Sequence, residues 1–388
     1  MGTIDAADVI ALTEADLDLH VTHEETRHLL AGPGLPSVSS LVGSGALGGR
    51  PLLRRVAELV DDAEQLAEEL RDQLVIGAVR SLDQDLASLL LDGATGRIST
   101  TCVFPRDPGL LGRSPLAPSL GALLRFAAVT EELAASRGRF ASAGYGAEAV
   151  AETSERLPSA FAAIAGEDGL AAYWRMATLI RPLARIARPG ADLRLDLPPG
   201  LLDDDFGSGA VMHFEDVDFP CALTHEPTRR FLREVGLPED GFWYTLDTDV
   251  PLAPLAEYHA DDPGAKAGLP ESADRLIRLG CLLEDSSLVV DGATGAVLHW
   301  SEPEEVLRPL NADISTLAFT VWLVHREQAL AEDHGLTEAY EELAATMVET
   351  LAAVDPIACD RTPTASWDDG WRYWREVFED EANGGPQA

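Results

Sequence analysis

Short runs of β-forming apolar residues flank one turn sequence that occurs twice in this chain. Leu288–Val290 and Ala296–Trp300 enclose the pentapeptide Asp-Gly-Ala-Thr-Gly at 291–295, and similar runs enclose an identical pentapeptide at 92–96. Asp-Gly between such runs is a strong hairpin signal, because aspartate closes the turn and glycine adopts positive φ at no steric cost. The pattern predicts one hairpin in each half. Catalysis is the alternative role for the two aspartates, and turn chemistry accounts for them without it.

Apolar residues at helical spacing follow each hairpin. The matching positions, displaced by 194 residues, are Leu116, Leu120 and Leu123 in the first half and Leu310, Ile314 and Leu317 in the second. This spacing predicts an amphipathic helix in each half, and the second one continues through Phe319 and Trp322 towards Gly335. Further helices are expected near 148–164 and 338–354, and at the Tyr-Trp-Arg sequences of 173–175 and 373–375.

A Thr-His-Glu sequence begins one more predicted helix in each half, at 22–24 and 224–226. We predict that Thr224 is the N-cap, with Pro227 in the first turn, because threonine caps helices and proline suits the first turn. A Gly-Leu-Pro sequence then ends the helix in both halves. The histidines, His23 and His225, are candidates for a metal-binding or catalytic role, and a structural role at the helix start is favoured over it.

These matches occur in the same order at nearly constant displacement, which indicates a duplicated domain. A period near 200 residues is too long for a solenoid repeat, so two whole globular domains are expected in tandem. The predicted domains are 1–185 and 200–388, separated by a stretch rich in Arg and Pro at 180–200. Within each half the strands and helices occur in separate runs, which favours an α+β fold.

Composition narrows the class of protein. The 388 residues are 46% hydrophobic, which indicates a globular chain, and no run of about 18 apolar residues predicts a membrane span. The acidic N-terminus does not have the pattern of a secretory signal. The four cysteines are scattered, so no zinc site is expected, and Cys102 and Cys281 are interpreted as buried strand thiols. These features favour a cytoplasmic location.

The formal net charge of −37 is unevenly distributed. Residues 1–200 hold 27 acids and 18 bases, a net charge of −9, whereas residues 201–388 hold 39 acids and 11 bases, a net charge of −28. This charge argues against direct binding to nucleic acid, because phosphates would be repelled. It favours rapid association with a basic protein partner. A generally acidic proteome is the alternative explanation, and it accounts less well for the asymmetry.

Sequences that resemble catalytic or cofactor motifs are incomplete. The glycine-rich stretch 43–49 does not have the Gly-Lys-Ser/Thr ending of a phosphate-binding loop. His213-Phe214-Glu215 with Pro220-Cys221 matches half of a zinc deaminase signature, but position 224 is Thr where the signature needs Cys. We therefore expect no catalytic residues, no metal and no cofactor.

The second half resembles the SUKH superfamily, and within it the fourth SUKH class of bacterial immunity proteins. The resemblance covers most of residues 200–330, and the first half repeats it more weakly. The residues that carry it are Leu223–His225, Arg229–Leu232, Val235–Pro238, Gly280, Val289–Val297, Leu310, Asn311, Ser315, Phe319 and Trp322.

The resemblance implies two tandem domains, each with an antiparallel β-sheet and flanking helices. It also implies a non-catalytic immunity protein that binds and neutralises a cognate toxin, often one that acts on nucleic acid, in the cytoplasm of the producing bacterium. A regulatory protein-interaction scaffold without a toxin partner is the alternative. The oligomeric state is left open.

An acidic inhibitor of a basic toxin is expected to use aromatic anchors surrounded by carboxylates. The candidate partner-binding residues, all in the second half, are Trp243, Tyr244, Asp247, Asp249, Trp300, Glu302, Glu304 and Glu305. The alternative is that Trp243 and Trp300 belong to the core and that the acids only interact with solvent.

Overall fold

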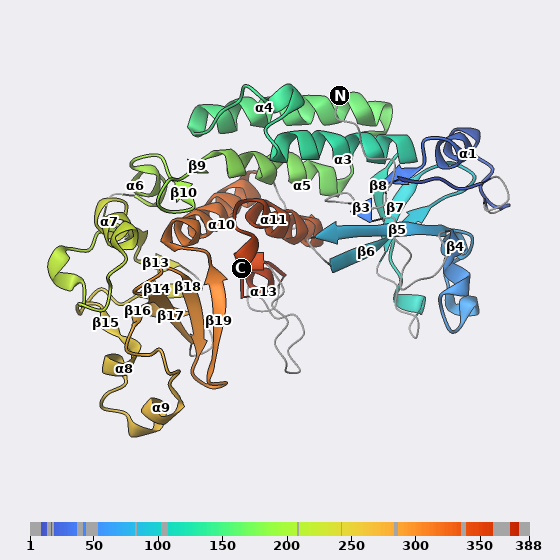
Figure 1. Ribbon diagram of the computed structural model, residues 1–388. Helices are drawn as coiled ribbons and strands as arrows, with labels where there is room; N and C mark the ends of the chain where they lie inside the picture. Colours follow the sequence, from blue (N-terminus) through green and yellow to red (C-terminus); the bar gives the residue numbers. More distant parts are fainter. Residues whose placement is uncertain are drawn as a thin grey trace. The chain divides into compact units, whose positions relative to one another are not determined.

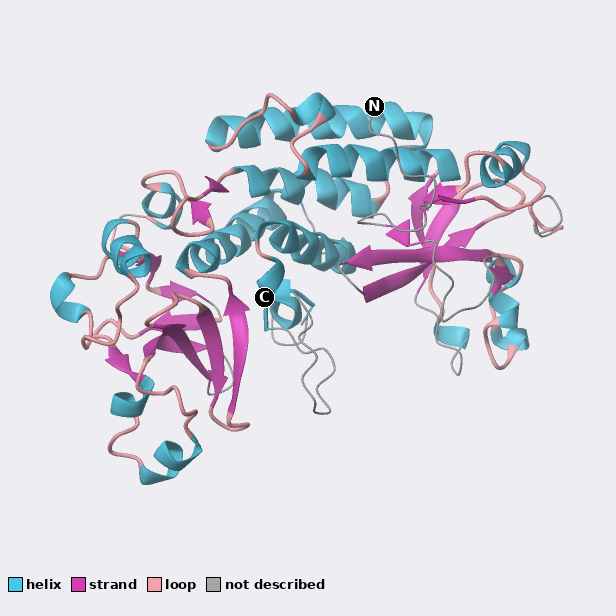
Figure 2. Ribbon diagram, viewed as in Figure 1, coloured by secondary structure: helices cyan, strands magenta, loops and turns pink. Residues whose placement is uncertain are grey.

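The computed structural model describes residues 9–13, 17, 19–36, 42–43, 53–81, 84–101, 108–207, 209–241, 243–282, 286–334, 339–359 and 373–379. Its internal contacts divide the chain into two compact units. Unit 1 comprises Met1–Ala143 and Glu152–Thr178, and unit 2 comprises Gly144–Ala151 and Leu179–Ala388. Each unit combines helices with antiparallel sheet, so the predicted α+β class is confirmed (Figure 2).

Unit 1 contains a six-stranded sheet in the order β3-β5-β6-β7-β8, with β4 also paired to β5 (Figure 1). All pairs in this sheet are antiparallel. Its strands are β3 (Val42–Gly43), β4 (Arg54–Arg55), β5 (Leu74–Ser81), β6 (Gln84–Leu91), β7 (Ile98–Thr101) and β8 (Ser114–Ala117), and β1 (Val9–Ile10) pairs separately with β2 (Leu35–Pro36).

The helices of unit 1 pack around an aromatic cluster. The Phe126 ring stacks on Trp174 at 4.6 Å between centroids and meets Phe161 edge-on at 5.1 Å. These rings come from three helices, so they hold the helical layer together beside the sheet. The helices are α1 (Glu24–Ala31), α2 (Glu68–Arg71), α3 (Leu120–Ala134), α4 (Ala147–Ala165) and α5 (Ala172–Ile180), of which residues 147–151 and 179–180 are assigned to unit 2.

Unit 2 contains a seven-stranded antiparallel sheet in the order β13-β14-β16-β17-β18-β19, with β15 also paired to β16. Its strands are β13 (Asp240–Gly241), β14 (Tyr244–Leu246), β15 (Ala253–Pro254), β16 (Leu276–Leu282), β17 (Ser286–Asp291), β18 (Val297–Ser301) and β19 (Val306–Asn311). Two short ribbons pair β9 (Arg188–Pro189) with β10 (Leu195–Asp196) and β11 (Val211–Met212) with β12 (Leu237–Pro238).

The two faces of this sheet are covered differently. On one face, Leu276, Val289 and Trp300 pack against Leu255 of α8. On the other, the ring of His299 lies 5.7 Å from the ring of Tyr373 in α13. The helices are α6 (Leu201–Phe206), α7 (Glu226–Glu234), α8 (Leu255–Tyr258), α9 (Pro263–Gly268), α10 (Ile314–His334), α11 (Tyr340–Val354), α12 (Pro356–Cys359) and α13 (Tyr373–Glu379).

Both predicted hairpins are confirmed, at β6–β7 and β17–β18. In each, the aspartate Oδ1 accepts from the backbone N–H groups two and three residues later, at 2.9 and 3.0 Å for Asp92 and at 3.0 and 3.1 Å for Asp291. Positive φ was expected at the glycine of each Asp-Gly pair, but Gly93 and Gly292 do not adopt it. The last glycines of the pentapeptides, Gly96 and Gly295, do, with φ values of 76° and 78°. The two aspartates therefore have the turn-closing role that the sequence predicted.

The Thr-His-Glu sequence packs on the hairpin turn of its own unit. The backbone N–H groups of Thr224 and His225 both donate to Gly292 O at 2.8 Å, and the equivalent groups in unit 1 donate to Gly93 O. The prediction that Thr224 is the N-cap is wrong by one residue, because α7 begins at Glu226 and His225 is its N-cap. The backbone N–H and the hydroxyl of Thr224 both donate to Gly292 O, so Thr224 is bound to the turn and the next residue takes the N-cap position.

The helices predicted after the hairpins are also confirmed as α3 and α10, but they begin later than expected. Leu116 and Leu310 lie in β8 and β19, while Leu120 and Ile314 are the first residues of the helices. The four-residue spacing between Leu116 and Leu120, and between Leu310 and Ile314, therefore runs from the end of a strand into a helix. The later helices, α4, α5, α11 and α13, occur where the sequence places them.

Candidate partner-binding site

The three aromatic residues of the predicted site are buried. Trp243, Tyr244 and Trp300 have exposed fractions of 3%, 4% and 2%. The Tyr244 hydroxyl donates to Pro238 O at 2.7 Å, and burial raises the pKa of this phenol. Tyr373 donates its hydroxyl to Trp243 O at 2.6 Å. Burial corrects the expectation that these rings are available as surface anchors. Trp243 and Trp300 are core residues, as the alternative held, and Tyr244 is buried with them.

Two of the predicted acids converge on one arginine that the sequence analysis missed. Arg278 of β16 forms an ion pair with Asp247, which follows β14. Its Nε donates to Ser287 Oγ at 3.0 Å, and the Ser287 hydroxyl donates to a carboxylate oxygen of Glu302 at the end of β18. The guanidinium also lies over the Tyr258 ring, 4.0 Å from its centroid. This network links the segment after β14 to the β18–β19 turn.

A second correction concerns Cys281, which also contacts this arginine. The thiol was predicted to be a buried strand residue, but Cys281 is exposed, and its Sγ accepts from Arg278 Nη2 at 2.9 Å. Cys102, predicted to be buried as well, lies outside the described residues.

Strand register shows that Arg278 is specific to the second copy. Arg278 pairs across the sheet with Val289, three residues before the turn glycine, and Val75 pairs with Leu90 at the same place in unit 1. Val75 belongs to an apolar cluster, whereas Arg278 has an exposed fraction of 5%. A buried charge is costly unless it is paired, so the carboxylate of Asp247 is needed for this residue to be tolerated. In the sequence, this residue could have been noticed as a lone arginine within the apolar run 276–282, a pattern that indicates a buried charge in need of a partner.

The remaining predicted acids are exposed. Asp249 follows β14 by three residues, and Glu304 and Glu305 lie in the β18–β19 turn. Glu304 pairs with Arg308 at 2.6 Å. Glu305 adopts a φ of 56° and lies against α9, where a Cβ on Gly268 would stand 2.5 Å from its Oε1. The Arg278 network joins the segment that carries Asp249 to the one that carries Glu304 and Glu305. The name acidic edge is used below for these three exposed acids, Asp249, Glu304 and Glu305.

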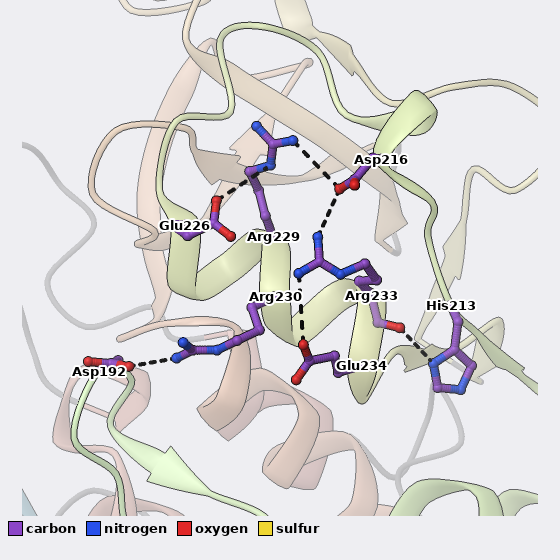
Figure 3. Close-up of polar contacts among 8 residues, drawn as sticks. All are labelled: Asp192, His213, Asp216, Glu226, Arg229, Arg230, Arg233 and Glu234. Carbon is purple, nitrogen blue, oxygen red and sulfur yellow. Dashed lines mark hydrogen bonds and ion pairs between the residues drawn. The ribbon is translucent and has the colours of Figure 1, made fainter.

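Most of the positive charge near α7 is neutralised locally. Arg229 and Arg233 both reach Asp216, at 3.7 and 2.8 Å, and Arg230 reaches Asp192 at 2.6 Å (Figure 3). The pairing with Asp192 raises the pKa of Arg230. Arginine to carboxylate pairs of this kind reduce the positive potential that a partner would meet.

The same holds for every arginine of residues 201–388 that the structure describes, since each lies within 4.0 Å of a carboxylate. The pairs beyond α7 are Arg275–Asp291, Arg278–Asp247, Arg308–Glu304, Arg326–Asp205 and Arg375–Glu379. Acids outnumber bases 39 to 11 in this half, so the carboxylates without an arginine determine its field.

Two titratable groups near the hairpin are perturbed. Burial, with a contribution from Arg308, lowers the pKa of His299 to about 4. Burial alone would raise the pKa of Asp291, but the backbone N–H groups of Ala293 and Thr294 and the charge of Arg275 outweigh it, so this pKa is lowered. His299 is therefore neutral and Asp291 ionised near pH 7.

Over the described part of the chain, no group of three His, Cys, Asp or Glu residues could hold a metal ion. No helix in the same part is long and apolar enough to cross a bilayer. His23 and His225 contact Thr26 and Thr228 at 2.9 and 2.8 Å, which fits a structural role at the helix start.

A family model described as SUKH-4 immunity protein matches residues 3–165 and 197–380. The two stretches correspond to the two halves of the duplication. The chain matches no curated protein and no solved structure.

Proposed function

The chain belongs to the SUKH-4 immunity protein family, and on this premise we propose that it binds and neutralises a cognate toxin through the acidic edge of its second domain. The observation that supports this most is the distribution of charge. The described arginines of residues 201–388 are paired with carboxylates, while Asp249 and Glu305 stand exposed with no ion pair among the described residues.

We propose a basic toxin that acts on nucleic acid. Such a toxin needs a cationic surface to hold phosphates, and an acidic inhibitor can occupy that surface. Electrostatic attraction of this kind raises the association rate and weakens with salt. The immunity protein itself would bind neither nucleic acid nor membrane.

The proposed role is non-catalytic and needs no cofactor, and it would be exerted in the cytoplasm of the producing cell. The proposed domains are 1–185 and 200–388, with the second as the one that grips the toxin. Asp247 and Glu302 would act by holding the acidic edge in place through Arg278, because both are engaged in the network described above.

Co-expression with candidate basic toxins, including any that is encoded beside the gene, tests this proposal. The full chain is expected to restore growth, and the double variant Asp249→Lys/Glu305→Lys is expected to restore it much less. A matched control, Asp61→Lys/Glu69→Lys, changes the net charge equally at exposed acids of unit 1. Equal loss in both variants would show that total charge, and not the acidic edge, is responsible.

Two other results would contradict the proposal itself. If the wild-type chain fails to restore growth, neutralisation of that toxin is excluded. Capture of several unrelated cellular proteins without any rescue would favour the regulatory scaffold.

A further inference from the structure

Unit 1 contains a cavity beside its hairpin turn. Its volume is about 390 Å³, which is within the range of small-ligand pockets. The lining comes from β7, β8, α3 and the short connection between α4 and α5. Leu116, Phe126 and Leu170 supply apolar surface, while Gln73 and Arg113 supply polar groups.

Unit 2 fills the equivalent place with its own chain. The connection between α11 and α13 has 18 residues, 355–372, whereas the connection between α4 and α5 has six, 166–171. The longer connection includes α12, which packs against β19. Asp355 caps it, with Oδ1 accepting from Ile357 N at 3.2 Å, and Ala358 and Cys359 are buried.

The residues that hold α12 in unit 2 are replaced in unit 1. Asp355 Oδ2 accepts from Asn311 Nδ2 at 3.2 Å and from Ala312 N at 2.8 Å, and Asn311 also donates to Thr320. Ala117 of β8 is the equivalent of Asn311 of β19, because each pairs with the first residue of the preceding strand. The displacement between them is 194 residues, the same as between Leu116 and Leu310. By the same displacement Pro118 replaces Ala312 and Phe126 replaces Thr320. The groups that bind Asp355 in unit 2 are thus absent from the equivalent positions of unit 1, which line a cavity of mixed apolar and polar character.

Within the described part of the chain, one atom of Gln73 and the guanidinium of Arg113 are left without a partner in the cavity. Gln73 is buried, with an exposed fraction of 6%; its side chain hydrogen-bonds Asp92, and its Oε1 has no hydrogen-bond partner among the described residues. Leaving a buried acceptor unsatisfied costs free energy, so such a group usually has a partner in the functional state. Arg113 is exposed at the rim and has no carboxylate within 4.0 Å in the described part of the chain, whereas Arg97 pairs with Asp168 at 2.9 Å.

We propose that this cavity binds a short peptide segment of a partner protein, one that presents an acidic residue followed one helical turn later by small apolar side chains. The acid would pair with Arg113, the apolar side chains would cover Leu116 and Phe126, and an N–H group would donate to Gln73 Oε1. Residues 355–359 of unit 2 are the intramolecular example of the apolar part of this packing. Their acid is held by Asn311 and Ala312, whose counterparts Ala117 and Pro118 offer no equivalent donor, so Arg113 would take that role in unit 1. This site is separate from the acidic edge and does not depend on toxin binding.

Methyl NMR of the full chain tests the proposal. The probe is a capped synthetic peptide with the sequence of residues 355–359, titrated to millimolar concentration under reducing conditions. Saturable shifts are expected at the methyl groups of Ile98, Leu116 and Leu170. Leu310 is the internal control, because the equivalent place in unit 2 is already filled and its signal should not move. Ala117→Leu, which fills the cavity, is expected to abolish the shifts.

A second peptide, in which Asn replaces the acidic residue, tests the proposed ion pair independently. It should bind the wild-type chain roughly two- to fivefold more weakly, the range for an exposed ion pair. In Arg113→Gln, an exposed substitution that leaves the core intact, the two peptides should bind equally. Absence of saturable shifts, shifts that persist in Ala117→Leu, or equal affinities for the wild-type chain would each overturn the proposal.

Discussion

The ion pair between Arg278 and Asp247 is asymmetric, and this makes the two single substitutions unequal. The exposed fractions of the two side chains are 5% and 27%. Asp247→Ala would leave the guanidinium buried without its counter-charge, whereas Arg278→Val would leave a carboxylate that water can reach. Valine is also the residue that unit 1 has at this register position, Val75.

The magnitudes follow from this difference. Breaking a buried pair by removing one partner costs about 3–5 kcal/mol. Arg278 keeps Ser287, Cys281 and the Tyr258 ring, so we expect a cost somewhat below this range, about 2–3 kcal/mol, for Asp247→Ala. For Arg278→Val, and for the double variant, a change within about 1 kcal/mol is expected, because apolar replacement of a buried pair is often neutral.

Native-state hydrogen exchange of the full chain measures these changes in the free energy of local opening. Amides of β16 and β17 should lose protection by about 30- to 150-fold in Asp247→Ala, since 1.4 kcal/mol corresponds to tenfold. Amides of β5 and β6 in unit 1 serve as the internal reference and should be unchanged. If Arg278→Val proved as damaging as Asp247→Ala, the reasoning from burial would be refuted.

Three further substitutions test other parts of the structure by the same measurement. Gly96→Ala is expected to destabilise unit 1 by about 2 kcal/mol, because φ is 76° and the new Cβ would lie 2.5 Å from His23 Nδ1; Gly112→Ala, with open space around it, is the control and should be near neutral. The pKa of His299 is about 4 in the folded state and about 6.5 in the unfolded state, so the unfolded state binds the proton first as the pH falls. Unit 2 should therefore be fully stable above pH 6.5 and lose about 3 kcal/mol as the pH falls to 4. His299→Thr introduces the residue that unit 1 has at the equivalent position, and it should remove most of this pH dependence. Asp291→Asn keeps the acceptor for the turn and loses only the pair with Arg275, which is 61% exposed, so it should cost less than about 1 kcal/mol, whereas Asp291→Ala should cost about 2 kcal/mol. Equal costs for the last two would mean that the turn hydrogen bonds contribute little.

Local chemistry explains why much of the fold could be predicted. The Asp-Gly turns specify their own hydrogen bonds within five residues, so both hairpins followed directly from the sequence. The amphipathic spacing likewise predicted the long helices. Where a strand passes into a helix, as at Leu116 and Leu310, the apolar pattern continues through the boundary, and only the backbone hydrogen bonds show where one ends.

The candidate site was less predictable because burial is a property of the assembled sheet. Trp243 and Trp300 have the composition of an interface anchor, yet the sheet of unit 2 turns both inward. Arg278 was overlooked since its meaning depends on Asp247, Ser287 and Glu302, which are brought to it by three other segments. The acids were chosen by their charge alone. Only the contacts in the structure show which of them bind other side chains, as Asp247 and Glu302 do, and which are exposed, as Asp249 and Glu305 are.

The sequence by itself determined the duplication, the α+β class, the hairpins and the acidic second half, because each depends on residue type and near neighbours. Tertiary structure decided which of the described acids form ion pairs and which are exposed, and it placed the aromatic rings in the core of unit 2. It also decided that unit 1 has a cavity at the place where α12 packs in unit 2. These depend on which distant segments meet, and the free energy of a buried charge or an unfilled cavity is set only after they have met.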